Sequence, residues 1–293
     1  MHINTLINQH KSKFDKFYNK ILLEKLSYSF LSKAMKYSSI SEGKRIRAFL
    51  VFQSSKMVNL SLENTMIISS SIESIHAYSL IHDDLPSMDN DDFRRGKPST
   101  HKKFGEATAI LAGDALHDFA FELLSGSLKK TDPKKNLELI NYLTVCTGNE
   151  GLAGGQSLDL LFENKKINKD KIIDMYSKKT GKLFEFSFSA PFIINGESKK
   201  RINFSKNFGS IFGTIFQIVD DILDEIEPFE EIGKTPGKDK KQGKRTLLSI
   251  IGKANVKNYC EKLISEFISK NKNEFLKNPI LEELLIYNIQ RLQ

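Results

Sequence analysis

Two clusters of aspartates stand out in this sequence, one near residue 85 and one near residue 222. The first contains Asp83, Asp84 and Asp89, and the second contains Asp220, Asp221 and Asp224. Each cluster lies at the end of an apolar run, where a solvated acidic patch is not expected. Crowded carboxylates repel one another and resist burial unless a cation neutralises them. Because Mg²⁺ takes oxygen ligands and shares them with substrate phosphates, two such clusters facing each other would hold a polyphosphate between metal ions.

The second cluster has the simpler geometry. Asp220 and Asp224 are four residues apart, so on a helix they project from one face, one turn apart. Gln217 precedes Asp220 by three residues and is expected on the same face. Two carboxylates at this spacing can chelate one ion or two adjacent ions. Taken alone, the motif is equally consistent with an exposed acidic helix end.

The first cluster needs a break in its helix. Asp83 and Asp89 are six residues apart, a spacing that points their side chains to different faces of a regular helix. Pro86 lies between them and predicts an end to the helix, after which the chain can fold Asp89 back toward Asp83. His76 lies about two turns before Asp83 on nearly the same stripe. A lone helical histidine is more often a core residue, but its place beneath this cluster favours a ligand-binding role.

Basic residues occur in three short motifs that could bind phosphate. These are Gly43-Lys44-Arg45-Ile46-Arg47, Arg94-Arg95-Gly96 and Lys178-Lys179-Thr180-Gly181-Lys182. Arginine offers a planar fork for phosphate oxygens, whereas lysine supplies a compact point charge. None of the three motifs is specific alone, since basic dipeptides at helix ends often serve solubility or the helix dipole.

The composition is that of an ordinary globular protein. The 293 residues are 40% hydrophobic and 27% charged, with 21 Phe, no Trp and a net charge of +8. The excess of positive charge fits a solvated basic surface, a protein that handles anions, or nucleic-acid binding. Cys146 and Cys260 are far apart and suggest neither a disulfide framework nor a zinc site. We expect no secretory signal, no stable membrane insertion and a cytoplasmic location.

Sparse glycine and proline and long apolar periodic stretches predict an all-α fold. Helices are expected over residues 65–85, 104–125 and 205–226, and loops over 87–99 and 228–243. Phe184, Phe186 and Phe188 alternate as in a strand, but their neighbours favour a helix that is disturbed at Pro191. No segment has the length or bias of an interdomain linker, so residues 1–293 are predicted to form a single domain.

The motifs become specific when they are taken in order. Besides those above, the chain contains Gly155-Gln156-Ser157-Leu158-Asp159 between the two aspartate clusters. The ordered set resembles the polyprenyl synthetase family of trans-isoprenyl diphosphate synthases, and most of all its bacterial farnesyl diphosphate synthases. The resemblance runs from about residue 25 to the C-terminus. It implies a single-domain bundle of long helices around a deep central cavity, with both aspartate motifs at its mouth.

The resemblance also implies a reaction. Isopentenyl diphosphate would condense with dimethylallyl and geranyl diphosphate, after Mg²⁺-assisted ionisation of the allylic diphosphate. Mn²⁺ could replace Mg²⁺, since carboxylates accept both ions. The family is usually homodimeric, and an exposed apolar helical face between residues 105 and 125 would fit a dimer. Nucleic acid is not an expected partner.

Roles for individual residues follow from the same resemblance. The implied metal ligands are Asp83, Asp84, Asp89, Asp220 and Asp224. The implied allylic diphosphate site contains Arg94, Lys179, Thr180, Gln217, Lys234 and Lys244. The implied isopentenyl diphosphate site contains Lys44, Arg47, His76 and Arg95. The implied catalytic residues are Arg94 and Lys179, together with Thr180 and Gln217, which would stabilise the carbocation.

Product length is expected to depend on Tyr78 and Ser79, about one turn before Asp83. In the family, an aromatic residue five positions before the first aspartate goes with a C15 product when that motif carries two extra residues. Tyr78 holds this position, and we therefore expect farnesyl diphosphate, with C10 and C20 products as alternatives. Glu42 and Arg245 depart from the family pattern at positions that bear on loop closure and affinity.

Three other functions compete with this interpretation. A catalytically inactive partner subunit would be expected to lack aspartates from one motif, and both motifs are present here. A terpene cyclase would not need Lys44, Arg47 and His76 for an isopentenyl site. A helical nucleic-acid-binding protein should present exposed basic stripes rather than paired acids, which repel phosphate when no metal is bound.

Overall fold

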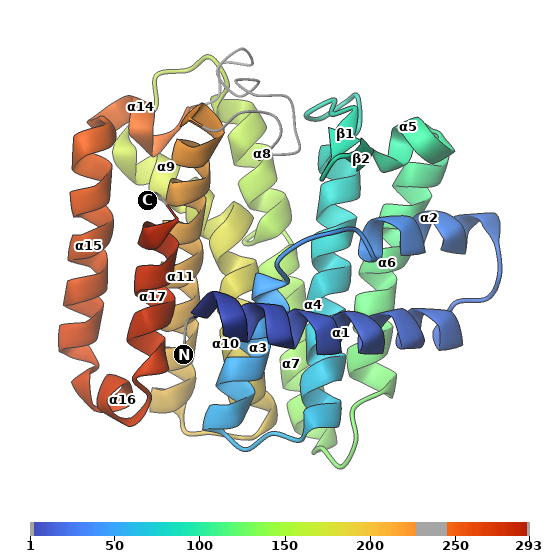
Figure 1. Ribbon diagram of the computed structural model, residues 1–293, viewed down its shortest axis with the longest axis horizontal. Helices are drawn as coiled ribbons and strands as arrows, with labels where there is room; N and C mark the ends of the chain where they lie inside the picture. Colours follow the sequence, from blue (N-terminus) through green and yellow to red (C-terminus); the bar gives the residue numbers. More distant parts are fainter. Residues whose placement is uncertain (1–2, 227–244, 292–293) are drawn as a thin grey trace. The chain divides into compact units, whose positions relative to one another are not determined.

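The computed structural model describes residues 3–226 and 245–291. These residues form two compact units. The first unit contains residues 3–141 and the turn 193–196, and the second contains residues 142–192, 197–226 and 245–291. Figure 1 labels the helices and strands of both units.

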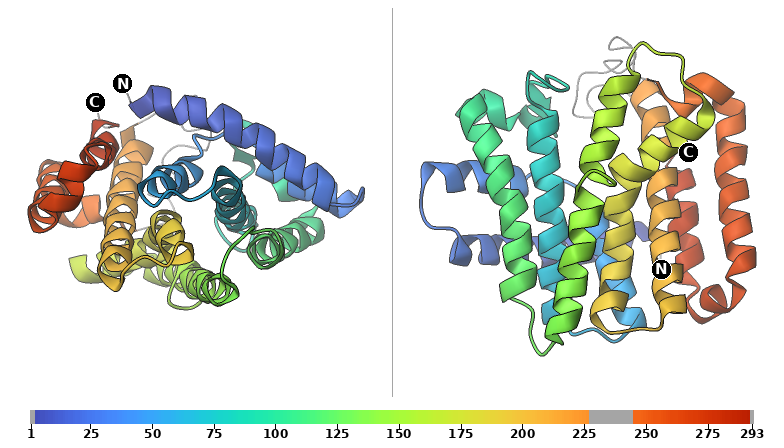
Figure 2. Two further views of the ribbon diagram at one scale, coloured as in Figure 1. Left: turned by 90° about the horizontal axis from the view of Figure 1, so that it is seen from below. Right: turned by 180° about the vertical axis from the view of Figure 1, so that it is seen from behind.

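The first unit is built from α1 to α6 and the start of α7. Its elements are α1 (Ile3–Lys25), α2 (Phe30–Ser39), α3 (Ile46–Met57), α4 (Leu62–Asp83), β1 (Phe93–Arg94), β2 (Lys97–Pro98), α5 (Thr100–Phe104), α6 (Glu106–Gly126) and α7 (Pro133–Thr147). Helix α1 lies across α3 and α4, while α4 and α6 run side by side (Figures 1 and 2). The core between them is apolar, because Phe14 and Leu22 of α1 meet Ile81 of α4 and Leu116 of α6 in one buried cluster.

The second unit holds the remaining elements. They are α8 (Leu152–Phe162), α9 (Lys169–Tyr176), the π-helical turn η1 (Ser177–Gly181), α10 (Lys182–Ile194), α11 (Lys199–Ile226), α14 (Leu247–Ile251), α15 (Lys253–Lys270), α16 (Lys272–Lys277) and α17 (Ile280–Gln290). Helix α11 packs against η1, α15 and α17. Phenylalanines dominate this core: the rings of Phe188 and Phe208 lie 4.2 Å apart, and those of Phe184 and Phe212 lie 5.2 Å apart.

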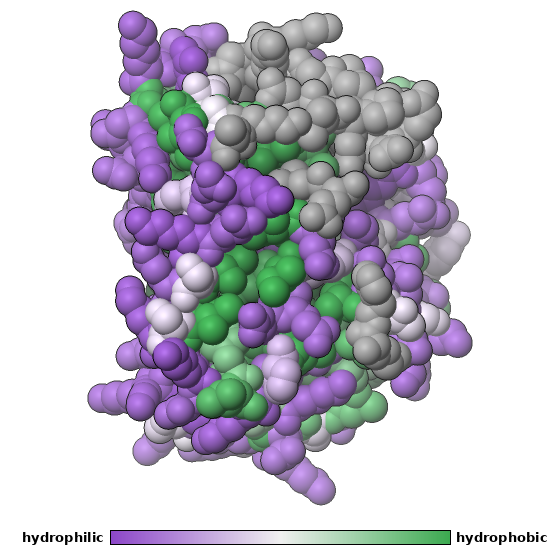
Figure 3. Space-filling view, turned by 60° about the vertical axis from the view of Figure 1, so that its left-hand side comes forward, coloured by the Kyte–Doolittle hydropathy of each residue, from purple (hydrophilic) through white to green (hydrophobic). Residues whose placement is uncertain are grey.

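Helix α15 shows how the surface of the second unit is kept polar. Lys257 pairs with Glu261 and Lys262 with Glu266, each one turn apart on the exposed side of the helix. Figure 3 turns the α14–α15 side forward, and hydrophilic side chains cover most of it around smaller hydrophobic patches. None of the described helices is long and apolar enough to cross a bilayer.

Most of the helix predictions are confirmed, with two differences. The predicted 104–125 helix is divided at Gly105, whose φ of +85° ends α5 and begins α6. The predicted 87–99 loop contains a short antiparallel hairpin in which Phe93 pairs with Pro98. The alternating phenylalanines are helical as predicted, and Pro191 lies inside α10. The predicted 228–243 loop lies outside the described residues.

Candidate active site

The first aspartate cluster follows the end of α4. The helix stops at Asp83, and the chain then turns back on itself through Pro86. The main-chain N–H of Asp89 donates to the carbonyl of Asp83 at 2.9 Å, and that of Met88 donates to the carbonyl of Leu85 at 2.9 Å. The turn therefore brings Asp89 back beside Asp83, as the sequence predicted.

Asp84, the residue after Asp83, is bound by Arg94. Its buried carboxylate, 2% exposed, accepts hydrogen bonds from Arg94, including Nε at 2.9 Å to Oδ1 and 3.2 Å to Oδ2. Arg94 Nη2 also lies 3.5 Å from Asp91 Oδ2. Burial alone would lower the pKa of Arg94, but the carboxylates of Asp84 and Asp91 raise it. The predicted metal role of Asp84 and phosphate role of Arg94 remain predictions, and here the two side chains hold each other.

Arg45, in the first basic motif, has a structural role. The sequence alone did not separate it from Lys44 and Arg47, the predicted phosphate ligands of the same motif. Its φ is +53°, and its buried guanidinium donates to Asp15 Oδ1 at 2.8 Å and to Glu73 Oε2 at 3.2 Å. A further bond joins Arg45 to the carbonyl of Ser39 at 2.8 Å. Glu73 Oε1 in turn accepts the N–H of Ala48 at 3.1 Å. These contacts anchor the start of α3, on which Arg47 lies, while Lys44 just before it is exposed.

Three of the four predicted isopentenyl diphosphate ligands share one electrostatic environment. Burial lowers the pKa of His76 well below its usual value, and Arg47 and Arg95 lower it further. Burial, together with Arg45 and Arg94, also lowers the pKa of Arg95 to about 10. Arg95 Nη1 donates to Ser41 Oγ at 3.0 Å. Such a concentration of positive charge favours an anionic ligand, and it also favours the neutral form of His76.

The predicted chain-length residues lie on the same helix, α4. The ring of Tyr78 packs edge-on against His82 at 5.0 Å and against His117 of α6 at 5.3 Å between centroids. Ser79 is buried, and its hydroxyl donates to the carbonyl of His76 at 3.0 Å. Tyr78 therefore faces α6, whereas the Ser79 hydroxyl is bonded within its own helix.

The second aspartate cluster lies on α11 and is held by side chains. Arg291, just after α17, pairs with Asp220. Gln217 Nε2 donates to Asp221 Oδ1 at 2.8 Å, and the hydroxyl of Tyr176 donates to Asp221 Oδ2. The sequence predicted Gln217 on the face of Asp220, and its amide hydrogen-bonds to Asp221, one turn along the helix.

The predicted allylic residues Lys179 and Thr180 lie in the π-helical turn η1. Thr180 Oγ1 donates to Gln217 Oε1 at 2.6 Å, so the two residues that were expected to stabilise a cation are bonded to each other. Lys179 Nζ bonds to Asp159 of α8. Single π-turns are rare and often occur at functional sites, and this one places both residues next to α8 and α11.

A close approach of main chains makes this turn possible. A Cβ atom on Gly155 of α8 would overlap the main chain of Lys179. A Cβ atom on Gly213 of α11 would lie 2.8 Å from Cα of Gly181. Glycine at these positions lets η1 pack directly against both helices. Lys234 and Lys244, the other two predicted allylic ligands, lie outside the described residues.

The donor chemistry of both clusters fits Mg²⁺. Asp83 and Asp89 in the first unit and Asp220 and Asp224 in the second supply carboxylate oxygens, the ligands that this hard cation prefers. Within residues 3–226 and 245–291, no three His, Cys, Asp or Glu side chains gather as a metal site would require.

A sequence model of the polyprenyl synthetase family matches residues 28–284. This chain belongs to that family. The match includes both aspartate clusters and all three basic motifs, so the resemblance that their order suggested is confirmed.

Similar proteins support the same assignment for this polyprenyl synthetase. The farnesyl diphosphate synthase of Haemophilus influenzae is 40% identical over 242 residues, which cover 82% of each chain. Geranylgeranyl pyrophosphate synthase 4 of Arabidopsis thaliana is 42% identical over 236 residues, covering 80% of this chain and 63% of that protein. A crystal structure of a geranyltransferase from Helicobacter pylori, complexed with magnesium and isoprenyl diphosphate, matches with a TM-score of 0.84 at 32% identity. That match covers 98% of this chain and 96% of the other, and it confirms the all-α isoprenoid synthase fold.

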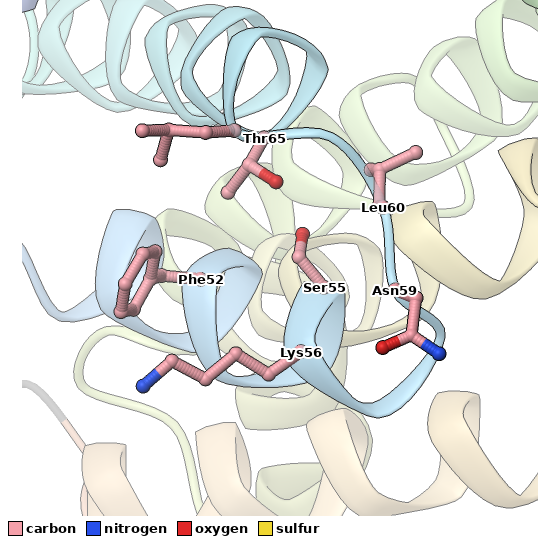
Figure 4. A pocket seen from close by; sticks show the side chains of 7 residues that line it. Phe52, Ser55, Lys56, Asn59, Leu60 and Thr65 are labelled. Carbon is pink, nitrogen blue, oxygen red and sulfur yellow. The ribbon is translucent and has the colours of Figure 1, made fainter.

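A pocket elsewhere in the polyprenyl synthetase is distinct from these residues. A pocket of about 540 Å³ opens between the end of α3 and the start of α4. Figure 4 shows the side chains that line it. Ser55 and Thr65 present hydroxyls there from the two helices, and Lys56 extends away along α3. The lining contains no carboxylate and none of the predicted site residues, so this pocket is not a candidate for the metal-dependent chemistry.

Several residues of the site were missed at the sequence level. Tyr176, Asp221 and Arg291 were given no role, although they contact the second cluster directly. Asp159 was noted only as part of a motif, and it bonds to Lys179. Asp221 could have been singled out from its adjacency to Asp220, whereas nothing local marks Tyr176 or Arg291.

Proposed function

We propose that this chain is a short-chain prenyltransferase that condenses isopentenyl diphosphate with dimethylallyl and then geranyl diphosphate, yielding farnesyl diphosphate. The observation that carries the proposal is the folding of Asp89 back onto Asp83, in the unit that also gathers Arg47, His76 and Arg95. Acids able to hold metal and cations able to hold diphosphate are thus built into one unit. The family membership of the chain supports the reaction type.

Ionisation of the allylic substrate breaks its C–O bond, and both electrons leave with the diphosphate. Asp83, Asp84 and Asp89 of the first unit, and Asp220 and Asp224 of the second, would hold Mg²⁺ ions, whose chemistry is to neutralise negative charge on a departing diphosphate. Arg94 of the first unit and Lys179 of the second, with Lys234 and Lys244, would donate to its oxygens. These contacts strengthen as charge builds up, so they lower the barrier more than they stabilise the bound substrate.

Isopentenyl diphosphate binds to Lys44, Arg47, His76 and Arg95. A diphosphate that enters this cluster replaces repulsion among cations with charge-assisted hydrogen bonds. His76 is neutral in the free protein and can donate or accept one bond without adding to the positive charge. The double bond of isopentenyl diphosphate then supplies the electron pair for the new C–C bond, and the released diphosphate takes the proton that is lost.

Between these two events the carbocation must be protected and stabilised. The Thr180–Gln217 pair, linked at 2.6 Å, presents oxygen dipoles near Lys179 for this purpose. A dry, nonbasic wall is also required, because water would quench the cation.

Tyr78 limits the product to C15 in this proposal. Its ring is wedged between His82 and His117, so it is a fixed obstacle rather than a freely rotating side chain. Geranyl diphosphate synthase remains an alternative, and the geranylgeranyl alternative is not favoured.

Chromatography of products made from isopentenyl diphosphate with each allylic primer tests activity and product length together. A main product of C15 is expected, and Tyr78→Ala should lengthen it; mainly C20 from the unaltered chain would refute the limit.

The same experiment addresses the competing function of an inactive partner subunit. The isolated chain with Mg²⁺ should be active without any second protein. Absence of product under these conditions, with restoration by a second prenyltransferase, would favour the partner role.

We also propose that both units form one synthase domain, that the protein is a homodimer and that it is cytoplasmic. The family match spans both units, which supports the single domain. Ile110 and Leu111 of α6 are 43% and 56% exposed, which supports an apolar dimer face on this helix. Sedimentation should give a dimer, and Leu111→Glu should shift it toward monomer.

A further inference from the structure

Tyr176 stands at the end of α9, directly before the π-helical turn η1. It is 2% exposed, yet its hydroxyl has two partners. It donates to Asp221 Oδ2 and accepts the main-chain N–H of Leu247 at 2.9 Å. Leu247 is the first residue of α14, so one phenol joins the second aspartate cluster to another helix of the same unit.

Asp221 continues this chain of hydrogen bonds toward the reacting residues. Its other oxygen, Oδ1, accepts Gln217 Nε2 at 2.8 Å. Gln217 Oε1 then accepts the hydroxyl of Thr180 at 2.6 Å. Because an amide has distinct donor and acceptor ends, the bond to Asp221 dictates that Gln217 turns its oxygen toward Thr180.

We propose that Tyr176 is a positioning residue for the prenyl transfer, which fixes the carboxylate of Asp221 and through it the orientation of Gln217 and Thr180. This inference rests on the proposed function and extends it to a residue that does not touch substrate. It also separates the two adjacent acids. Asp220 is a predicted metal ligand that here pairs with Arg291, whereas Asp221 is the acceptor that organises the neighbouring donors.

Two physical arguments support this role. A buried hydroxyl without a hydrogen-bond partner would destabilise the folded protein. The two hydrogen bonds of the Tyr176 hydroxyl therefore explain why Tyr rather than Phe fits here. Burial and the adjacent Asp221 carboxylate raise the pKa of Tyr176, so the hydroxyl stays protonated and keeps donating at neutral pH. Partners that orient active-site groups in this way commonly change activity about 10- to 100-fold when removed.

The experiment compares two Tyr→Phe variants. Tyr176→Phe keeps the ring and removes only the hydroxyl. Tyr142→Phe is the matched control, because the Tyr142 hydroxyl also donates to a carboxylate in the second unit, that of Glu185, away from the aspartate cluster. Both variants should lower the melting temperature by a few degrees. Only Tyr176→Phe should lower kcat, by about 10- to 100-fold, while KM for both diphosphates stays within about threefold of the unaltered value.

A second readout does not depend on catalysis. Hydrogen exchange of the 245–251 segment should be faster in Tyr176→Phe than in the unaltered protein and in Tyr142→Phe, since the Leu247 N–H loses its acceptor. Equal kcat for the two variants, or unchanged exchange of this segment, would overturn the positioning role. An increase in KM at constant kcat would also overturn it. Failure of the unaltered protein to form any prenyl product would instead refute the proposed function and leave the exchange result to decide the hydrogen-bond network.

Discussion

The two aspartate clusters have similar composition but are shaped in different ways. In the first unit, Asp83 and Asp89 are brought together by the main chain, through a turn closed by a 2.9 Å N–H to carbonyl bond. In the second unit, Asp220 and Asp224 are one turn apart on the unbroken helix α11, and distant side chains orient the cluster. The first cluster therefore depends on local sequence, whereas the second depends on long-range contacts.

The ion pairs of the two regions also differ in burial. The side chains of Arg45 and Glu73 in the first unit are 5% and 3% exposed. Those of Arg291 and Asp220 in the second are 14% and 34% exposed. A buried charge that loses its partner is costly, whereas a partly solvated one is compensated by water. The first region should therefore respond to charge removal mainly in stability, and the second mainly in ligand affinity.

The largest effect is expected at the acids themselves. Asp83→Asn keeps the shape of the side chain and removes its charge, and kcat/KM should fall about 10³-fold or more because metal-assisted ionisation is impaired. Asp220→Asn should behave alike if the clusters are equivalent in function despite their different construction. Steady-state kinetics with dimethylallyl and isopentenyl diphosphate measures both. Asp118→Asn, at an exposed position on α6, is the control, and a loss there of similar size would show that the effect is not specific.

The next largest effect is expected on stability, when the buried charge of Glu73 in the first unit is removed. Glu73→Gln leaves the buried guanidinium of Arg45 without a full counter-charge, and the free energy of unfolding should fall by about 3–5 kcal/mol. Urea unfolding measures the change. Arg291→Gln is the counterpart in the second unit and should cost under about 1 kcal/mol. Equal losses in the two variants would contradict the difference in burial.

Two glycines test the contrast between main-chain and side-chain contacts. A Cβ atom at Gly155 would meet the rigid main chain of Lys179, so Gly155→Ala should lower stability by about 1–3 kcal/mol and reduce kcat with it. A Cβ atom at Gly43 would lie 2.9 Å from the guanidinium carbon of Arg95, a flexible end that can move away. Gly43→Ala should therefore raise KM for isopentenyl diphosphate with little loss of stability.

Gly126→Ala serves as the control, because a Cβ atom there would meet nothing within 4 Å. Thermal unfolding and kinetics on all three variants rank the effects. If Gly43→Ala lowered stability as much as Gly155→Ala, the guanidinium of Arg95 would have to be as rigid as a main chain, and the contrast would fail.

The same distinction explains what the sequence could predict. The turn at Pro86 is local, since a proline between two acids is enough to forecast that the helix ends and the chain returns. The helical state of the Phe184–Phe188 stretch was also predicted, because its neighbours outweigh a short alternation. The two clusters themselves, and the order of the basic motifs, were visible as residue types at fixed spacings.

What the sequence could not predict depends on segments far apart in the chain. Arg291 and Asp220 are 71 residues apart, and Tyr176 and Asp221 are 45 apart, so no local pattern marks either pair. The π-helical turn arises where η1 packs closely against α8 and α11, through contacts that periodicity does not reveal. The hairpin at Phe93–Pro98 was missed because its two strands are only two residues each.

Arg291 offers a sharper test of the second cluster. Its guanidinium pairs with Asp220 and lies 4.3 Å over the ring of Phe216, so it occupies the position of a cation beside a predicted metal ligand. A metal ion must compete with it, and Arg291→Gln should tighten Mn²⁺ binding to the ligand-free protein about tenfold, equivalent to about 1.4 kcal/mol. Electron paramagnetic resonance of free Mn²⁺ gives the affinity, with Lys277→Gln as the control. Weaker binding in Arg291→Gln would mean that the arginine supports the metal site instead.

The smallest expected effect is a dependence of stability on pH, which arises from His76 and the arginines near it in the first unit. The folded-state pKa of His76 lies below its unfolded value of about 6.5, because of burial and the adjacent arginines. Above about pH 6.5, His76 is neutral in both the folded and the unfolded state. As the pH falls through this value, the imidazole takes up a proton in the unfolded state more readily than in the folded state. Stability is therefore lost on acidification, by at most about 1.4 kcal/mol per pH unit. The free energy of unfolding, measured in urea from about pH 7.5 to about pH 5, should decline more steeply for the unaltered protein than for His76→Gln. Inorganic pyrophosphate should flatten that decline, because an anion among Arg47, Arg95 and His76 favours the protonated imidazole; equal slopes with and without it would place the anion elsewhere.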